Sequence, residues 1–103
     1  MARPPALQLD KTELVLFDLE AKRPQIHNLR YDQISRIQCG RRRQFRLYHF
    51  VAEDAIEIQS RTRLEPFLLT RRRNKTDFDR FEGELEAFAK RNNITFGRSV
   101  PDT

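Results

Sequence analysis

Two kinds of hydrophobic spacing divide the chain near residue 75. Before it, apolar side chains come in short runs or alternate with polar ones, which is the period of β-strands. After it, they recur three or four positions apart, which is the period of an amphipathic helix. The pattern therefore predicts a mainly β domain with one helix near its C-terminal end.

Seven strands are expected before the helix. The second is apolar at nearly every position, which indicates that both of its faces are covered and that it is central in its sheet. Pro66 suggests that the last strand starts at a sheet edge, because proline cannot donate to a ladder. The predicted strands are residues 7–10, 13–19, 25–31, 34–39, 45–51, 56–61 and 64–72.

The middle of the chain is interpreted as a hairpin. Residues 45–51 alternate strictly, with Phe45 and Val51 expected on one face. Glu53 and Asp54 are expected to turn the chain into the alternating strand 56–61. The polar residues 40–44 are expected to form the loop before this hairpin.

The predicted helix begins at Thr76, which is placed to act as N-cap, with Asp79 three residues later in an arrangement like a capping box. Asn92 and Asn93 suit a left-handed C-cap. Gly83 in the helix interior suggests a packing contact that needs a small residue. One apolar stripe is formed by Phe78, Phe81, Leu85 and Phe88.

Length and composition indicate a single domain in a reducing compartment. With 103 residues only one core can be filled, and we expect it over residues 6–93, with a leader at 1–5 and a tail at 94–103. The single cysteine, Cys39, excludes an intramolecular disulfide. No apolar run reaches the roughly 20 residues that span a bilayer, and no signal peptide is evident, so we expect a cytoplasmic protein.

The element order and several hydrophobic spacings resemble the pleckstrin-homology-like fold, in particular its small bacterial and GRAM-like members. The likeness is carried by residues 14–17, by residues 29–37 with Tyr31, Ile34 and Ile37, and by the helical stripe. The resemblance implies a sandwich or barrel of six or seven antiparallel strands capped by one C-terminal α-helix. An α+β fold, with one antiparallel sheet covered by one helix, is the alternative. The resemblance also implies recognition of a phosphoinositide, an acidic peptide, another protein or a second copy.

Charge is the sharpest functional feature of the sequence. The net charge is +5, and residues 1–75 hold 16 basic and 9 acidic residues. Guanidinium groups can hold phosphate or carboxylate with two hydrogen bonds, although arginines on exposed strands also serve solubility. The first candidate ligand-binding cluster is Arg36, Arg41, Arg42, Arg43 and Arg46. The second basic patch is Arg61, Arg63, Arg71, Arg72, Arg73 and Lys75.

The sequence shows no motif for catalysis or for metal binding. His27 and His49 are interpreted as structural, because neither has a ligand at metal-binding spacing. Cys39 is expected to be a half-buried thiol, although arginines close to it would lower its pKa. Nucleotide-binding loops and hydrolase motifs are also missing. We therefore expect neither enzymatic activity nor a cofactor or metal.

The expected function is binding without catalysis. A protein partner or self-association comes first, through a strand edge or through the arginine clusters. A basic nucleic-acid-binding domain is one alternative, since Phe45, Tyr48 and Phe50 alternate with arginines. A binder of acidic lipid or of a membrane surface is the other.

Overall fold

The chain folds into two open β-sheets and one long helix. The computed structural model describes residues 6–18, 23, 25–46 and 49–98, with backbone alone for residue 18 and for residues 42–46 and 49–52. The first sheet has the order β1-β2-β3, with every pair antiparallel. Its strands are β1 (Leu7–Leu9), β2 (Glu13–Asp18) and β3 (Gln25–Arg30).

The second sheet has the order β6-β5-β4-β7 and includes one parallel pair, β4 with β7. Its strands are β4 (Ile34–Arg46), β5 (His49–Ser60), β6 (Phe67–Thr70) and β7 (Thr95–Arg98). A 3-10 turn, Tyr31–Gln33, joins the two sheets, and the helices are α1 (Arg71–Asn74) and α2 (Asp77–Asn92).

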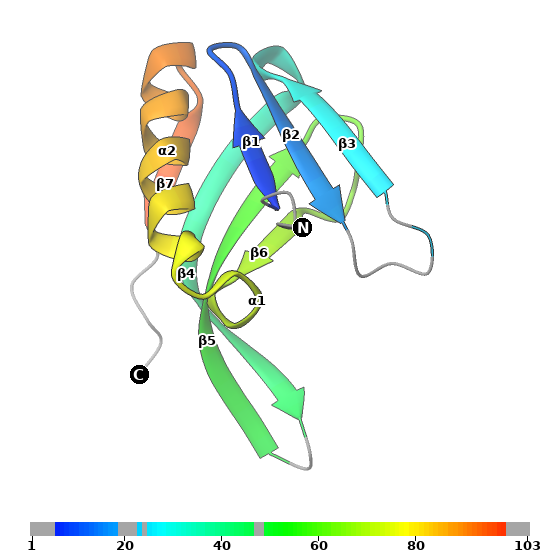
Figure 1. The fold of residues 1–103 in the computed structure, drawn as a ribbon, viewed down its shortest axis with the longest axis vertical. Coiled ribbons are helices and arrows are strands. Elements are labelled where there is room, and N and C mark those ends of the chain that lie inside the picture. The colour runs from blue at the N-terminus through cyan, green and yellow to red at the C-terminus, as the bar shows by residue number, and fades with distance from the viewer. Residues whose placement is uncertain (1–5, 19–22, 24, 47–48, 99–103) are drawn as a thin grey trace, which may run out of the picture.

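One core holds these parts together. In Figure 1 the first sheet and α2 lie next to each other in front of the second sheet, and side chains from all three layers meet between them. The predicted helical stripe is confirmed as the buried face of α2. The core includes Leu14, Leu16 and Leu29 from the first sheet, Ile37, Ile56 and Ile58 from the second, and Phe78, Phe81, Leu85 and Phe88 from α2.

The architecture is mainly β with one main helix, as the sequence predicted. A barrel is not formed by the described strands, because both sheets end in free edges, at β1 and β3 and at β6 and β7. The prediction that β2 is central in its sheet is confirmed, and so is the prediction that Pro66 precedes an edge strand. One described pair departs from the expected antiparallel arrangement, because β7, which was not predicted as a strand, runs parallel to β4.

The predicted loop at residues 40–44 and the predicted turn at Glu53 and Asp54 were wrong. Both segments lie inside strands, and Arg41 is opposite Asp54 while Arg42 is opposite Glu53. Opposite charges on facing strands favour pairing, so this polar stretch continues the ladder instead of interrupting it.

The prediction of a single strand over residues 45–51 was also wrong. Phe45 is opposite Phe50 and Arg46 is opposite His49, so the chain reverses between β4 and β5. The alternation that suggested one strand belongs to two antiparallel arms. Leu47 and Tyr48 lie outside the described residues.

The segment before α2 also differs from the prediction. Only Phe67–Thr70 of the expected strand 64–72 is extended, and α1 follows at once. The Thr70 hydroxyl accepts a hydrogen bond from the backbone N–H of Arg73 at 3.3 Å, which caps α1 and ends the strand.

The ends of α2 were predicted to within one residue. Asn93 has φ 55° and forms the expected left-handed C-cap. Thr76 precedes the helix but already has helical backbone angles, and its side chain makes no capping hydrogen bond, so the capping box was wrong. Gly83 has no heavy atom within 4 Å of the position a Cβ would take, so the packing reason given for it was wrong as well.

The chain after α2 returns to the sheet. Residues 95–98, within the expected tail, form β7, and Phe96 packs against the core. Neither described helix has the length and the apolar run that a membrane span requires.

Candidate functional site

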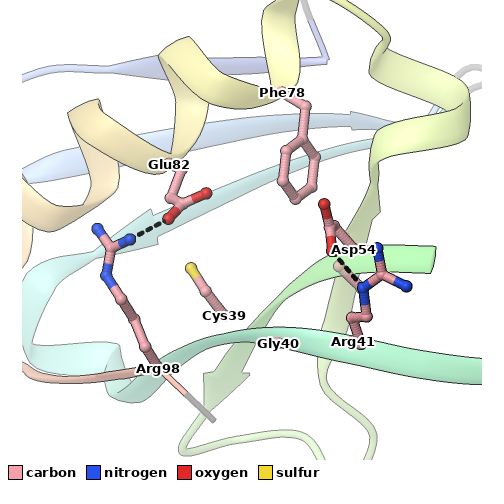
Figure 2. Close-up of a pocket in the computed structure, with 8 residues that line it drawn as sticks. Cys39, Gly40, Arg41, Asp54, Phe78, Glu82 and Arg98 are labelled. Atoms are coloured by element: carbon pink, nitrogen blue, oxygen red, sulfur yellow. Dashed lines mark hydrogen bonds and ion pairs between the residues drawn. The ribbon is translucent and has the colours of Figure 1, made fainter. Parts of the chain in front are cut away.

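A cleft lies between the N-terminal half of α2 and strands β4, β5 and β7. Its volume is about 250 Å³. Phe78 and Glu82 come from the helix, and the thiol of Cys39 points into the cleft from the strand below (Figure 2). The lining residues are Cys39, Gly40, Arg41, Asp54, Ala55, Phe78, Glu82 and Arg98.

Arg98 closes one side of the cleft. Its guanidinium is 2.5 Å from a carboxylate oxygen of Glu82 and 2.6 Å from one of Glu86. The hydrogen bond with Glu86 and the charge of Glu82 raise the pKa of Arg98. These contacts attach β7 to α2, and they occupy both carboxylates of this helical turn.

Asp54 organises the other side. Its carboxylate oxygens are 3.4 Å from Nε of Arg41 and 2.8 Å from Nε of Arg71. Arg71 continues to Asp79 on α2, with an N–O distance of 2.9 Å. The hydrogen bonds that Arg71 donates, first to Asp79 and then to Asp54, raise the pKa of Arg71, and the hydrogen bond accepted by Asp79 lowers the pKa of Asp79. Asp54 thereby joins β4, β5 and α1, and Arg71 extends the network to α2.

Cys39 is a protonated thiol at neutral pH. Burial, followed by the charge of Glu82, raises its pKa to about 11, and the opposing effect of Arg98 is smaller. Its side chain is buried, more completely than the expected half-buried state. A reactive cysteine needs a lowered pKa, so this environment is unsuited to nucleophilic chemistry.

The first arginine cluster is divided along β4. Arg36 is exposed and lies within the body of the second sheet, opposite Gln59 on β5 and Thr95 on β7. Arg41 is exposed and bound to Asp54. Further along the strand, Arg42 is opposite Glu53, Arg43 opposite Ala52 and Arg46 opposite His49.

The second basic patch falls into two groups. Arg61 donates from Nε to the carbonyl oxygen of Asp32 at 3.1 Å, and the guanidinium of Arg63 lies 4.2 Å from the ring centre of Phe67. Both contacts belong to the loop after β5. The other four residues, Arg71, Arg72, Arg73 and Lys75, are on or directly after α1.

His27 and the described carboxylates do not form a metal site, and the side chain of His49 lies outside the described part of the structure. His27 is half-buried, and its ring centre is 4.8 Å from that of Phe67, a packing contact. Among residues 6–98 as far as they are described, three or more His, Cys, Asp or Glu side chains nowhere come together in a way that could hold a metal ion.

Sequence reasoning missed the ion pairs of the site, because Asp54 was expected in a turn and Arg98 in the tail. One available signal was the spacing of Glu82 and Glu86, four residues apart and therefore on one side of the helix. Nothing local in the sequence identifies Arg98 as their partner.

The tertiary structure thus brings one arginine of each cluster, Arg41 and Arg71, together at Asp54. Comparison of the chain with protein-family models, with curated proteins and with solved structures gives no match.

Proposed function

We propose that this protein is a binding module without enzymatic activity, and that it recognises an acidic partner through one basic end. The basic end consists of the ribbon, which is residues 41–46 and 49–54 of β4 and β5, together with Arg72, Arg73 and Lys75 at α1. The observation that carries the proposal is that Asp54 binds both Arg41 on β4 and Arg71 on α1, and so holds the exposed Arg72 and Lys75 beside the base of the ribbon.

The electrostatics support a binding role for this end. Arg71 is held by Asp54 and Asp79, so it serves the fold. Arg72 and Lys75 beside it are exposed and extend into solvent. An array of guanidinium and ammonium groups raises the local concentration of anions and steers an acidic partner toward the surface.

The chemistry of the cleft argues against catalysis there. The thiol of Cys39 is protonated at neutral pH, because its pKa is about 11. The carboxylate of Glu82, the other ionisable group that α2 contributes to the cleft, is held in an ion pair by Arg98.

The pleckstrin-homology-like fold remains part of the proposal. Two sheets, one long helix that packs on both, and the order of elements as far as α2 support it. A cytoplasmic location also remains a proposal, supported by the single reduced cysteine.

Self-association is a second candidate, favoured by one observation. Ile26 on the edge strand β3 is 62% exposed and lies opposite Phe17. An apolar side chain on a free edge is a common docking position for another strand. Light scattering tests this by comparing the molar mass of Ile26→Lys with that of the unchanged protein. An equal mass for both would exclude self-association through the β3 edge.

Two triple variants with equal loss of charge test the basic end. The first is Arg72→Gln, Arg73→Gln and Lys75→Gln. The control, Arg30→Gln, Lys90→Gln and Arg91→Gln, changes exposed residues at the far end of β3 and α2 (Figure 1). On immobilised heparin, a sulfated polyanion, we expect the first variant to elute at clearly lower salt than the control. Equal elution would indicate attraction by net charge alone.

A further inference from the structure

The ribbon is a two-stranded arm. Pairing of β6 with β5 starts at Ala55, and pairing of β7 with β4 ends at Cys39, so the described strands beyond these points pair only with each other. Figure 1 shows β4 and β5 continuing below α1, away from α2, from the first sheet and from the other strands of the second sheet. Six residue pairs, from Arg41 and Asp54 to Arg46 and His49, form this arm. At 3.4 Å per residue it is about 17 Å long.

Positive charge continues to the end of the arm. Both of its acidic residues, Glu53 and Asp54, are at the base, opposite Arg42 and Arg41. From residue 43 to 52 the sequence has arginines and no acidic residue. In the ladder Arg43 is opposite Ala52 and Arg46 is opposite His49.

We infer that the partner of the basic end is double-stranded nucleic acid, with the ribbon lying in a major groove and α1 beside the phosphates. This inference rests on the proposed function. The major groove of B-form DNA is about 12 Å wide and about 8.5 Å deep, and it admits a two-stranded β-ribbon. Arg72, Arg73 and Lys75 stand at the base of the ribbon, where the groove wall carries phosphates.

The distribution of charge favours a duplex over a membrane. Four of the six residues in the first strand of the ribbon, 41–46, are arginines, and charged groups are costly to place in hydrocarbon. The basic residues also follow a line along an arm instead of surrounding a pocket, which suits a polymer with regularly spaced phosphates. The sequence pI of about 10.0 agrees with such a partner.

Fluorescence anisotropy with a labelled 20-base-pair DNA duplex tests the inference, at about 50 to 300 mM salt. Contacts with about four phosphates predict a log-log slope of affinity against salt near −3.6. The variant Arg43→Gln with Arg46→Gln should bind at least about tenfold more weakly at low salt, with a slope near −1.8. The control, Arg30→Gln with Arg91→Gln, removes equal charge at the opposite end and should change affinity less than about threefold.

A charge-conserving variant and a folding measurement separate loss of binding from loss of structure. Arg43→Lys with Arg46→Lys retains the charges and should retain the slope, and thermal unfolding followed by circular dichroism checks each variant. A ribbon variant that loses duplex binding while it still unfolds cooperatively supports the inference.

Three results would overturn it. The first is tighter binding to single-stranded DNA of the same sequence than to the duplex, and the second is equal loss in ribbon and control variants. The third is binding of polyglutamate or of phosphatidylserine vesicles without binding of the duplex, which leaves the proposed function in place. Failure of all these probes to bind at low salt would refute the proposed function as well.

Discussion

The contribution of α2 to the stability of the fold can be measured by replacing Phe81. Its side chain is fully buried, with 0% exposed, in the cluster that joins both sheets. Phe81→Ala removes the ring and leaves a cavity among side chains from three layers. Substitutions of this kind cost about 3–5 kcal/mol when the surroundings relax only partly.

This cost is large beside the whole stability of such a domain. Globular proteins have about 0.05–0.15 kcal/mol of stability per residue, which gives roughly 5–15 kcal/mol for a chain of this length. Each kcal/mol moves Tm by about 4–8 °C in a domain of this size. We therefore expect Phe81→Ala to lower Tm by roughly 12–40 °C, measured by circular dichroism and urea unfolding.

Gly83→Ala is a matched control on the same helix. The position is exposed, and no heavy atom lies within 4 Å of where the new Cβ would be. Alanine lowers the entropy of the unfolded chain and favours the helix, so stability should rise by about 1 kcal/mol. A loss below about 1 kcal/mol for Phe81→Ala would mean that α2 is not needed for the core, contrary to the burial of its aromatic face.

Three further predictions follow from individual side chains. Because burial raises the pKa of Cys39 from 9.0 to about 11, iodoacetamide at pH 8 should alkylate it roughly a hundredfold more slowly in the native protein than in urea; equal rates would contradict the burial. Asp79→Asn should destabilise the protein at pH 7. The folded-state pKa of Asp79 is lowered, so the stabilisation by Arg71 is fully present above the unfolded value of 3.8 and is lost as pH falls through the folded-state pKa. The difference in unfolding free energy between the two proteins should therefore vanish in strong acid, and a constant difference would exclude the pair. Asn93→Ala should cost about 1 kcal/mol in urea unfolding, because φ is 55° there, while Asn93→Gly should not.

Local sequence patterns were reliable where a buried face sets the period. The stripe of α2 and the apolar run of β2 lie where the sequence placed them, since such faces can be covered in only one orientation. The same rule failed at residues 45–51, because both arms of a hairpin alternate and the alternation does not record where the chain reverses.

Loops were predicted wrongly where charged residues pair across neighbouring strands. Arg41 and Asp54 each indicated a loop in isolation, yet they face each other in the ladder. Their contact spans 13 residues of sequence, a separation at which a local window cannot show complementarity. The helical turn α1 was missed because a short capped turn has no period of its own.

By itself, the sequence determined the class of the fold, the buried face of the helix and the excess of arginine. These are properties of composition and of neighbours along the chain. Only the tertiary structure decided that Asp54 binds both Arg41 and Arg71, that Arg98 binds Glu82 and Glu86 on α2, and that the ribbon extends beyond the other strands of its sheet. The physical reason is that an ion pair depends on the distance between two charges in space, and the sequence gives only their separation along the chain.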